Sequence, residues 1–589
     1  MQKKFIKGAS LVPVLLCLTS LVSCSKQEQT VADTVVYSTI YTSNTKQEYV
    51  EAFAIKDSKY IYVGSKEGAK SFIKEGATKV IDKSDGFVMS GATEGHGHYV
   101  MSSVLKSKGL ICQANTIDDA VAFAKGVVEA DKEKKQTVYF TYGWQNEEIK
   151  GVKASVDVRA KLDEFCPDKP LLLIDDTGHN IFMNSKAIEQ AGIDKDPKWS
   201  IKGGYVSREG GKEDGKLLGL ASDIAMNYVV NLVLKPAGVI SKSDFATAMK
   251  DCEETLHSNG YTSYLDAYTS YFGDCAYEGI SAYDVDVGMK VYMAACYKID
   301  AYEDIKTQVD KAASLMETKK TTHFNPNNIK VFADGEAFEN QSAWVYTPYK
   351  NGTYGQQVWD DEKIKSLVER ANSQGVSVHA HTSGDHAADQ LVDAYIAAES
   401  SVKKDAKVIN SLGHCAQLTE DTKGKMASHH IPSATNITWR IKPTAGIESV
   451  KQNFNWDYWM KGYPMKSLLD KGVVMSSSTD YPSNSGCPID ILNIMQIAVT
   501  GTVNENLIPS STIYSFSSDE FITLEQAMDV FTINGAKQLG NDDERGSIEV
   551  GKYADFVYLD KNIKTAAHIS DANISEVYFE GALAYTKKA

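Results

Sequence analysis

The sequence predicts an α/β protein in which a TIM-like (β/α)8 barrel carries a small β-sandwich domain built from both chain ends. Three observations support this fold class. Short β-type runs occupy both ends of the chain, and the long centre alternates apolar, β-branched runs with amphipathic helical stretches. Several of the central runs also end in a histidine or an aspartate. With 589 residues, 43% of them hydrophobic, the chain is long enough for one large barrel and a second, smaller domain.

The first residues predict a processing signal. A basic start with three lysines precedes an apolar stretch, residues 11–21, that is too short to span a bilayer. Leu21-Val22-Ser23-Cys24 then resembles a bacterial lipoprotein signal that ends at the cysteine to be lipidated. We therefore expect residues 1–23 to be a signal peptide, Cys24 to carry lipid, and residues 24–33 to be a tether. An ordinary secretory signal or a membrane anchor helix is the alternative. The expected location is the cell envelope, exported and held at a membrane by the N-terminal lipid.

Charge and cysteine usage exclude some classes of protein. The formal net charge is −15, and no stripe rich in lysine or arginine is present, which argues against nucleic acid as a partner. The nine cysteines show no CxxC spacing and fall mostly in apparent strands and helices. They are typical of small buried hydrophobes more than of a disulfide framework.

Residues 34–88 and 541–589 have the same β-rich texture. The first part contains TVVYSTIYT, YVEAFAI, YIYVGS and KVIDK, and the second contains GSIEVGKYADFVYLD and SEVYFEGALAYT. We expect these parts to form one β-sandwich, with the barrel of residues 89–540 inserted between them.

The eight barrel strands are expected in chain order. They are GFVMSGATEGHGH (86–98), GYTSYLDA (260–267), GMKVYMAAC (288–296), NIKVFADG (328–335), VSVHAH (376–381), VINSLGH (408–414), IPSATN (431–436) and VVMSSSTD (473–480). Helical segments such as EKIKSLVERANSQG and LEQAMDVFTINGAKQLG place apolar residues at a spacing of three to four. Between the first two strands, an insertion of about residues 101–255 has its own strands, TVYFTYGW and PLLLIDDTGHN.

Metal-ligand side chains stand at the C-terminal ends of these strands, where such barrels keep their active sites. His96 and His98 are two residues apart, so on a strand both point to one face, roughly 7 Å apart along the chain. From there both imidazoles can reach one ion at about 2.0–2.1 Å. A lone HxH is weak evidence, because paired histidines on a strand are commonly structural. The ordered set predicts a hydrolytic metal centre: His96, His98, His381, His414 and Asp480.

Four further segments resemble the amidohydrolase superfamily, specifically the family 3 group of N-substituted formamide deformylase-like proteins. They are DDTGHNIFMNSKAIEQAGI, IKVFADG, HTSGDHAADQLVDAY and GSIEVGKYADFVYLD, and the resemblance runs from about Val31 to Lys588. It implies that His96, His98 and Asp480 bind one metal and that His381 and His414 bind a second.

The resemblance also implies a role for Lys330, which stands where a strand-4 lysine of the superfamily reacts with CO₂ to give a carbamate that bridges two metals. Only a neutral amine is nucleophilic, so this chemistry needs a depressed lysine pKa. An ordinary lysine and a mononuclear site are the alternatives. Imidazole and carboxylate ligands suit zinc, although iron, manganese or cobalt also fit.

The chain departs from the family pattern at four positions, none of which is a metal ligand. Glu94 stands where an aspartate is usual, Gly97 where valine is common, Gly413 where an acidic residue is common, and Gly219 where relatives often have glutamate. These differences leave the substrate open.

The implied activity is that of a metal-dependent amidohydrolase acting on a C–N bond of a small molecule. Bound ions would lower the pKa of a water toward about 7, and the resulting hydroxide would attack an amide-type carbonyl. Asp480 would take the water's proton and pass it to the leaving nitrogen. The alternatives are a deaminase, a lactone or ester hydrolase on the same site, and a surface lipoprotein that binds a ligand without catalysis.

Three residues are weaker candidates for contacting the substrate. His179 and Asn184 lie in the DDTGHN segment of the insertion, where capping of the insertion is an equal alternative; Trp144 has aromatic packing as its alternative. His379 alternates with His381 and is expected to support the ligands or to pack. The sequence names neither the substrate nor the oligomeric state.

Overall fold

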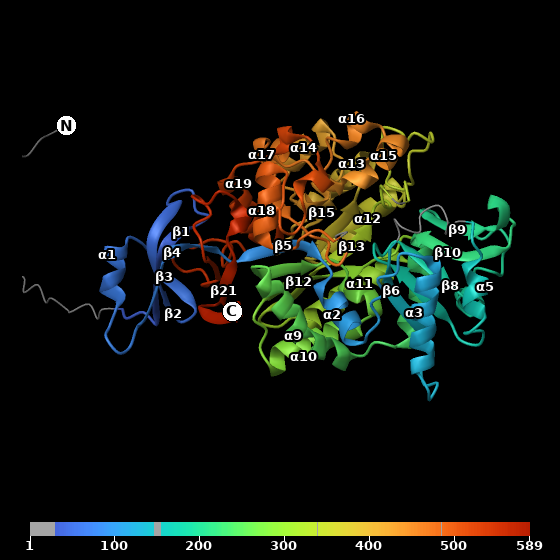
Figure 1. Ribbon diagram of the computed structural model, residues 1–589, viewed down its shortest axis with the longest axis horizontal. Helices are drawn as coiled ribbons and strands as arrows, with labels where there is room; N and C mark the ends of the chain where they lie inside the picture. The colour runs from blue at the N-terminus through green and yellow to red at the C-terminus, as the bar shows by residue number, and fades with distance from the viewer. Residues whose placement is uncertain (1–29, 146–154, 339, 484–485, 589) are drawn as a thin grey trace, which may run out of the picture.

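The computed structural model describes residues 30–145, 155–338, 340–483 and 486–588 (Figure 1). The predicted signal peptide, the lipidation site Cys24 and most of the tether lie outside the described residues. Lipid attachment therefore stays a prediction.

The centre of the chain forms the predicted barrel. Its eight strands are β5 (Ala92–Gly97), β11 (Tyr261–Asp266), β12 (Tyr292–Lys298), β13 (Phe324–Phe332), β14 (Ser377–Thr382), β15 (Ser411–His414), β16 (Ser433–Thr435) and β18 (Met475–Ser477). Each pairs in parallel with the next. The first and last strands meet at their C-terminal ends, where the Asp480 N–H donates to the His96 carbonyl at 3.0 Å and the His98 N–H to the Tyr481 carbonyl at 2.7 Å. The prediction of a (β/α)8 barrel is confirmed.

Strand register brings the candidate residues to one level of the barrel. Phe332 of β13 pairs with His381 of β14, and Thr382 of β14 pairs with His414 of β15. All six residues of β14 are buried, as expected for a strand covered on both faces. Because parallel strands end at the same rim, side chains from distant parts of the sequence converge there.

Helices surround the barrel, and their sequences explain their limits (Figure 1). The helix α9 (Lys242–Ser258) begins at a capping box in which Ser241 and Asp244 bond each other's backbone N–H groups. The helix α12 (Asp361–Ser373) buries Ile364, Leu367, Val368 and Ala371, which share one face at helical spacing. The predicted helix over residues 362–375 is therefore held by its apolar stripe. The predicted helix over residues 524–540 is two helices, α19 (Leu524–Phe531) and α20 (Ile533–Leu539), which are interrupted at Thr532.

The insertion contains a five-stranded sheet in the order β6 (Tyr139–Trp144), β7 (Leu171–Asp175), β8 (Asn180–Met183), β10 (Leu217–Asp223) and β9 (Gly204–Arg208). One face packs on α3 (Ile117–Ala130) and α5 (Val158–Asp163) around a small apolar core. The helix α2 (Tyr99–Ser107) packs instead with α9 of the barrel. The sheet with α3 and α5 spans residues 117–223, inside the stretch of about 101–255 that the sequence suggests for the insertion.

Both chain ends enter one seven-stranded sheet. Its order is β22 (Ala582–Thr586), β21 (Ile574–Phe579), β20 (Phe556–Leu559), β4 (Lys79–Ser90), β1 (Thr34–Tyr41), β2 (Tyr49–Lys56) and β3 (Lys59–Gly64). Phe53 of β2 and Phe556 of β20 have ring centroids 5.0 Å apart, although three strand spacings of about 4.8 Å separate their strands. The sheet must therefore curl over itself, which gives a sandwich-like core.

The barrel and the β-domain are joined by ionic contacts around Glu580. His323, at the start of β13, lies 3.0 Å from Asp284 through Nδ1 and 3.4 Å from Glu580 through Nε2. Arg545 contacts both Glu580 and the buried Asp555. Burial opposes protonation of His323, but its two carboxylate partners outweigh burial and raise its pKa to about 9.

This contact should make stability depend on pH. A histidine whose pKa rises from about 6.5 in the unfolded chain to about 9 stabilises the fold most below pH 6.5, and this stabilisation is lost as pH rises through 9. We expect His323→Gln to lower the free energy of unfolding by about 1–2 kcal/mol at pH 6, allowing for partial exposure, and by little at pH 10. Thermal unfolding of both proteins across this range measures the difference. An equal loss at both pH values would contradict the charged pair.

Two further features of the fold concern the pairing of the cysteines and the length of the apolar helices. No disulfide joins any two of the seven cysteines of the described residues, and five of them are buried. Within the described ranges no single helix is long and apolar enough to cross a membrane, and residues 224–237 and 242–258 meet that test only together, bent by 111°.

Candidate metal centre

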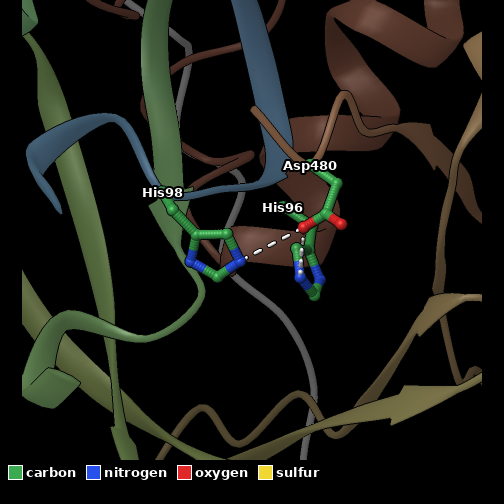
Figure 2. Close-up of side chains that lie close together, drawn as sticks. All are labelled: His96, His98 and Asp480. Atoms are coloured by element: carbon green, nitrogen blue, oxygen red, sulfur yellow. Dashed lines mark ion pairs between the residues drawn. The ribbon is translucent and has the colours of Figure 1, made fainter. Parts of the chain in front are cut away.

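Three side chains from the two ends of the barrel sheet form a compact cluster (Figure 2). His96 lies near the end of β5, His98 is the residue that immediately precedes α2, and Asp480 follows β18. One oxygen of Asp480, Oδ1, lies 3.1 Å from His98 Nε2 and 3.4 Å from His96 Nε2. The potential ligand atoms of the three residues all fall within 4.8 Å of one another, which suits a single cation.

Three more predicted ligands line the same cavity, which encloses about 470 Å³ including its open mouth. The ring centroid of His414 lies 4.5 Å from that of His96 and 4.4 Å from that of His381. Lys330 Nζ lies 3.3 Å from His96 Nε2. The structure thus brings together all six residues that the sequence predicts as ligands.

Hydrogen bonds fix which nitrogen of two histidines can bind a cation. His381 Nε2 lies 3.2 Å from the Gly335 carbonyl, which only accepts, so Nε2 carries the proton and Nδ1 keeps its lone pair. His414 Nδ1 donates to Asn436 Oδ1 at 3.0 Å, so its Nε2 keeps the lone pair. Such outer contacts orient ligating imidazoles.

His379 positions His96 through a direct contact between the two imidazole rings. Its Nε2 lies 2.7 Å from His96 Nδ1, and its Nδ1 lies 2.7 Å from Ser411 Oγ. Since its two nitrogens are engaged in this way, His379 is a positioning residue and does not face the cavity.

Protonation states in the cluster suit metal binding. Burial lowers the pKa of His96, His381 and His414 well below the usual range, so these imidazoles are neutral. Burial also lowers the pKa of Lys330 to about 8. Burial opposes ionisation of Asp480, but hydrogen bonds from His96 and His98 outweigh it and hold the pKa of this carboxyl below its usual range.

Glu94, one of the departures from the family pattern, ties the two ligand-bearing strand ends together. Its Oε1 accepts from the backbone N–H groups of His96 and Thr479, both at 3.0 Å. The side chain is fully buried, and burial raises its pKa to about 8. Glu94 therefore holds His96 and Asp480 in register without facing the cavity.

Gly413, another departure, gives room to the metal ligands. A Cβ atom at this position would lie 2.6 Å from His96 Nδ1 and 3.0 Å from His379 Nε2. A side chain here would push His96 out of place, so the acidic residue common at this position in the family cannot fit against the His96–His379 pair.

We expect Gly413→Ala to lower kcat/KM by about 10- to 100-fold, since small displacements of catalytic groups cost this much. Steady-state kinetics measures the loss. Gly424→Ala is the matched control, because Gly424 lies in α14 (Glu420–Ser428) with no atom within 4 Å of the added Cβ. Unchanged activity in Gly413→Ala would show that His96 tolerates the shift.

Of the three weaker candidates for contacting the substrate, only His179 is among the described residues that line the cavity. His179 lines the cavity, and its Nδ1 lies 2.8 Å from Asp223. Burial opposes protonation of His179, but Asp223 outweighs it and raises the pKa of the imidazole to about 9, so the ring is a cation at neutral pH. With Nδ1 engaged, Nε2 is left to face a ligand.

Asn184 and Trp144 are not among the described residues that line the cavity, so the structure does not bring them to the predicted site. Asn184 caps α6 (Ser185–Ala191) by accepting from the Ala187 N–H, and its amide donates to the carbonyls of Cys166 and Lys169. Trp144 is fully buried in the core of the inserted sheet, stacked on Phe182 with centroids 4.4 Å apart. Asn184 thus caps a helix of the insertion and Trp144 packs against an aromatic ring, which are the two structural alternatives that the sequence analysis gives for them.

A cluster of imidazoles and one carboxylate at the C-terminal rim of a parallel barrel defines a metal-dependent hydrolase. Residues 79–585 match the Amidohydrolase family, and the chain belongs to this family. It is therefore a hydrolase that acts on carbon–nitrogen bonds.

Individual relatives are distant. The chain is 25% identical over 551 residues to the protein LONG AFTER FAR-RED 3 of Arabidopsis thaliana. The matched region covers 90% of this chain and 88% of that protein. It is 25% identical over 447 residues to the N-substituted formamide deformylase of Arthrobacter pascens, covering 73% and 76%. An uncharacterized metal-dependent hydrolase from Pyrococcus horikoshii OT3 superposes with a TM-score of 0.66 at 18% identity, covering 91% and 99%. This last likeness shows the fold alone.

Proposed function

We propose that this enzyme hydrolyses an amide-type C–N bond of a small molecule, an N-acyl or N-formyl amine. One observation carries the proposal: six side chains suited to a hydrolytic metal centre line a single cavity at the barrel mouth. The activity for which the A. pascens relative is named, deformylation of N-substituted formamides, agrees with this class of substrate.

The donor set fits one or two divalent cations. The imidazoles of His381 and His414, with their oriented lone pairs, and the ionised Asp480 carboxylate are ligands that zinc favours. Iron, manganese and cobalt accept such ligands too. A cation held by these residues would acidify a water molecule and polarise the amide carbonyl. We place His96, His98 and Asp480 at one ion and His381 and His414 at the second.

Asp480 and His179 have distinct roles in this scheme. Because its pKa is held low, Asp480 is a carboxylate at neutral pH and can accept the proton of the attacking water, then return it to the leaving nitrogen. His179, protonated through Asp223, can donate from Nε2 to a substrate oxygen.

We propose that Lys330 is carboxylated, and its carbamate would then supply oxygen ligands for the bound cations. Its pKa of about 8 leaves part of the amine neutral at physiological pH, and only the neutral amine adds CO₂. Carbon-13 NMR of protein equilibrated with labelled bicarbonate should give a carbamate signal that Lys330→Met lacks. Identical spectra would leave Lys330 as a plain amine.

The deciding experiment is a turnover screen of the zinc-loaded protein against N-formyl and N-acyl amines, N-acyl amino acids, cyclic amides, lactones and aminopurines. The proposal expects release of an amine and a carboxylate, abolished by a chelator and restored by metal. Ammonia release from aminopurines alone would identify a deaminase, and turnover of lactones alone an ester-type hydrolase. Stably bound metal without turnover of any amide would overturn the proposal.

We also propose that Cys24 anchors the enzyme to the cell envelope, on the strength of the sequence that precedes it. Membrane fractions should then contain the protein, and Cys24→Ser should move it to the soluble fraction. An unchanged distribution would exclude the lipid anchor.

A further inference from the structure

Two tyrosines stand next to each other in the wall of the metal cavity. Tyr268 and Tyr271 follow β11, at the short helical turn η4 (Thr269–Phe272). Their ring centroids lie 5.0 Å apart in an edge-to-face arrangement, and their side chains are only 5% and 4% exposed. Both line the cavity together with the predicted metal ligands.

Neither hydroxyl has a hydrogen-bond partner among the residues that the structure describes. A buried hydroxyl without a partner costs about 1–3 kcal/mol, so two of them together in one cavity wall are expensive to keep for packing alone. A ligand in the cavity would supply the missing partners.

The wall behind Tyr268 is positively charged. The ammonium groups of Lys298 and Lys235 both lie 5.6 Å from the centroid of the Tyr268 ring. Asp300 is the buried carboxylate that these two lysines share; it contacts Lys298 directly, and Glu303 nearby is exposed to solvent. Two cations against one buried carboxylate leave a positive potential, which favours an anion on the cavity side.

The tyrosines stand apart from the reacting centre. Phe332 lies between Tyr268 and His381, with centroid distances of 6.2 Å and 5.2 Å respectively. The Phe332 ring thus separates Tyr268 from His381, so a group bound at Tyr268 would be a part of the substrate other than the scissile amide.

We propose that Tyr268 and Tyr271 bind a carboxylate on the non-reacting part of the substrate, so that the enzyme selects amides that bear an anionic group, such as N-acyl amino acids. Both O–H groups donate to the carboxylate oxygens. This inference rests on the proposed amide hydrolysis and narrows it to one class of substrate.

Binding of matched pairs to the metal-loaded Asp480→Asn variant tests the inference without turnover. The pairs are N-acetylglycine with N-methylacetamide, N-acetylalanine with N-ethylacetamide, and N-acetylphenylalanine with N-acetylphenethylamine; members of a pair differ only in the carboxylate. Calorimetry should show about 10-fold or greater preference for the carboxylate member in at least one pair, a ratio expected of hydrogen bonds to a charged group. The preference should vanish in Tyr268→Phe/Tyr271→Phe. A preference that survives the double variant, or none in any pair, overturns the inference.

Tyr277→Phe is the matched control. Tyr277, in α10 (Cys275–Asp286), is also fully buried, but it does not line the cavity. Removing it should leave the carboxylate preference unchanged. Thermal unfolding without ligand should show Tyr268→Phe and Tyr271→Phe as neutral or stabilising, because each deletes a buried, unsatisfied hydroxyl.

The two proposals can fail separately. Carboxylate-selective binding with no amide turnover in the substrate screen would overturn amide hydrolysis and leave the carboxylate site supported. Amide turnover with no selectivity between the members of a pair would support amide hydrolysis and overturn the carboxylate site.

Discussion

Replacing Asp480 by asparagine lowers kcat by about 10³-fold or more and leaves the barrel folded. The substitution keeps the shape of the side chain but removes the group that accepts the water's proton, and general-base catalysis contributes about 10²–10⁴-fold. The loss also removes a charged oxygen that lies 3.1 Å and 3.4 Å from the two imidazoles of the cluster. Steady-state kinetics with the substrate found in the screen measures the effect, alongside metal content.

Asp490→Asn is the control for this change. Asp490 caps α18 (Ile491–Thr500) by accepting from the Asn493 N–H, and asparagine caps a helix about as well as aspartate. Kinetics should therefore be unaffected. Asp480→Asn with normal turnover and normal metal content would remove Asp480 from the mechanism.

His381→Ala should lose about one equivalent of bound metal, with turnover falling to background while the fold is kept. Its Nδ1 lone pair is left free by the Nε2 contact with Gly335, and alanine offers no ligand in its place. Metal analysis after dialysis and circular dichroism measure the two parts of this prediction.

His386→Ala provides the comparison, because it removes an imidazole only five residues away. His386 is stacked between Trp344 and Tyr346, at centroid distances of 3.6 Å and 4.2 Å, and does not line the metal cavity. It should retain its metal. Full metal occupancy in His381→Ala would mean that His381 is not a ligand.

The barrel and its ligands could be predicted because each depends on a short local pattern. A β-branched run that ends in histidine or aspartate marks both a buried parallel strand and the rim at which it ends. The position of Lys330 followed from the family resemblance, and the structure places its amine beside His96. His379 follows the same alternation as His381, and only the tertiary contact with His96 shows that it supports a neighbouring ring.

The substrate-binding wall could not be predicted in this way. Trp144 and Asn184 lie in segments that suggest function, yet their partners are the core and a helix N-terminus of the insertion. Tyr268 and Tyr271 were missed because tyrosine is common in this chain, which has 31, and nothing in the sequence marks a hydroxyl that lacks a partner. That property exists only once the surrounding side chains are in place.

The seven-stranded sheet also constrains how the protein is made. Its central strand β4 pairs with β1 on one side and with β20, more than 460 residues later, on the other. During translation β4 emerges early, so the edge later covered by β20 stays open until nearly the whole polypeptide has left the ribosome. An open strand edge invites pairing with other chains. Premature termination near the carboxyl end would therefore produce aggregation-prone fragments, even when every residue of the metal cavity has been synthesised.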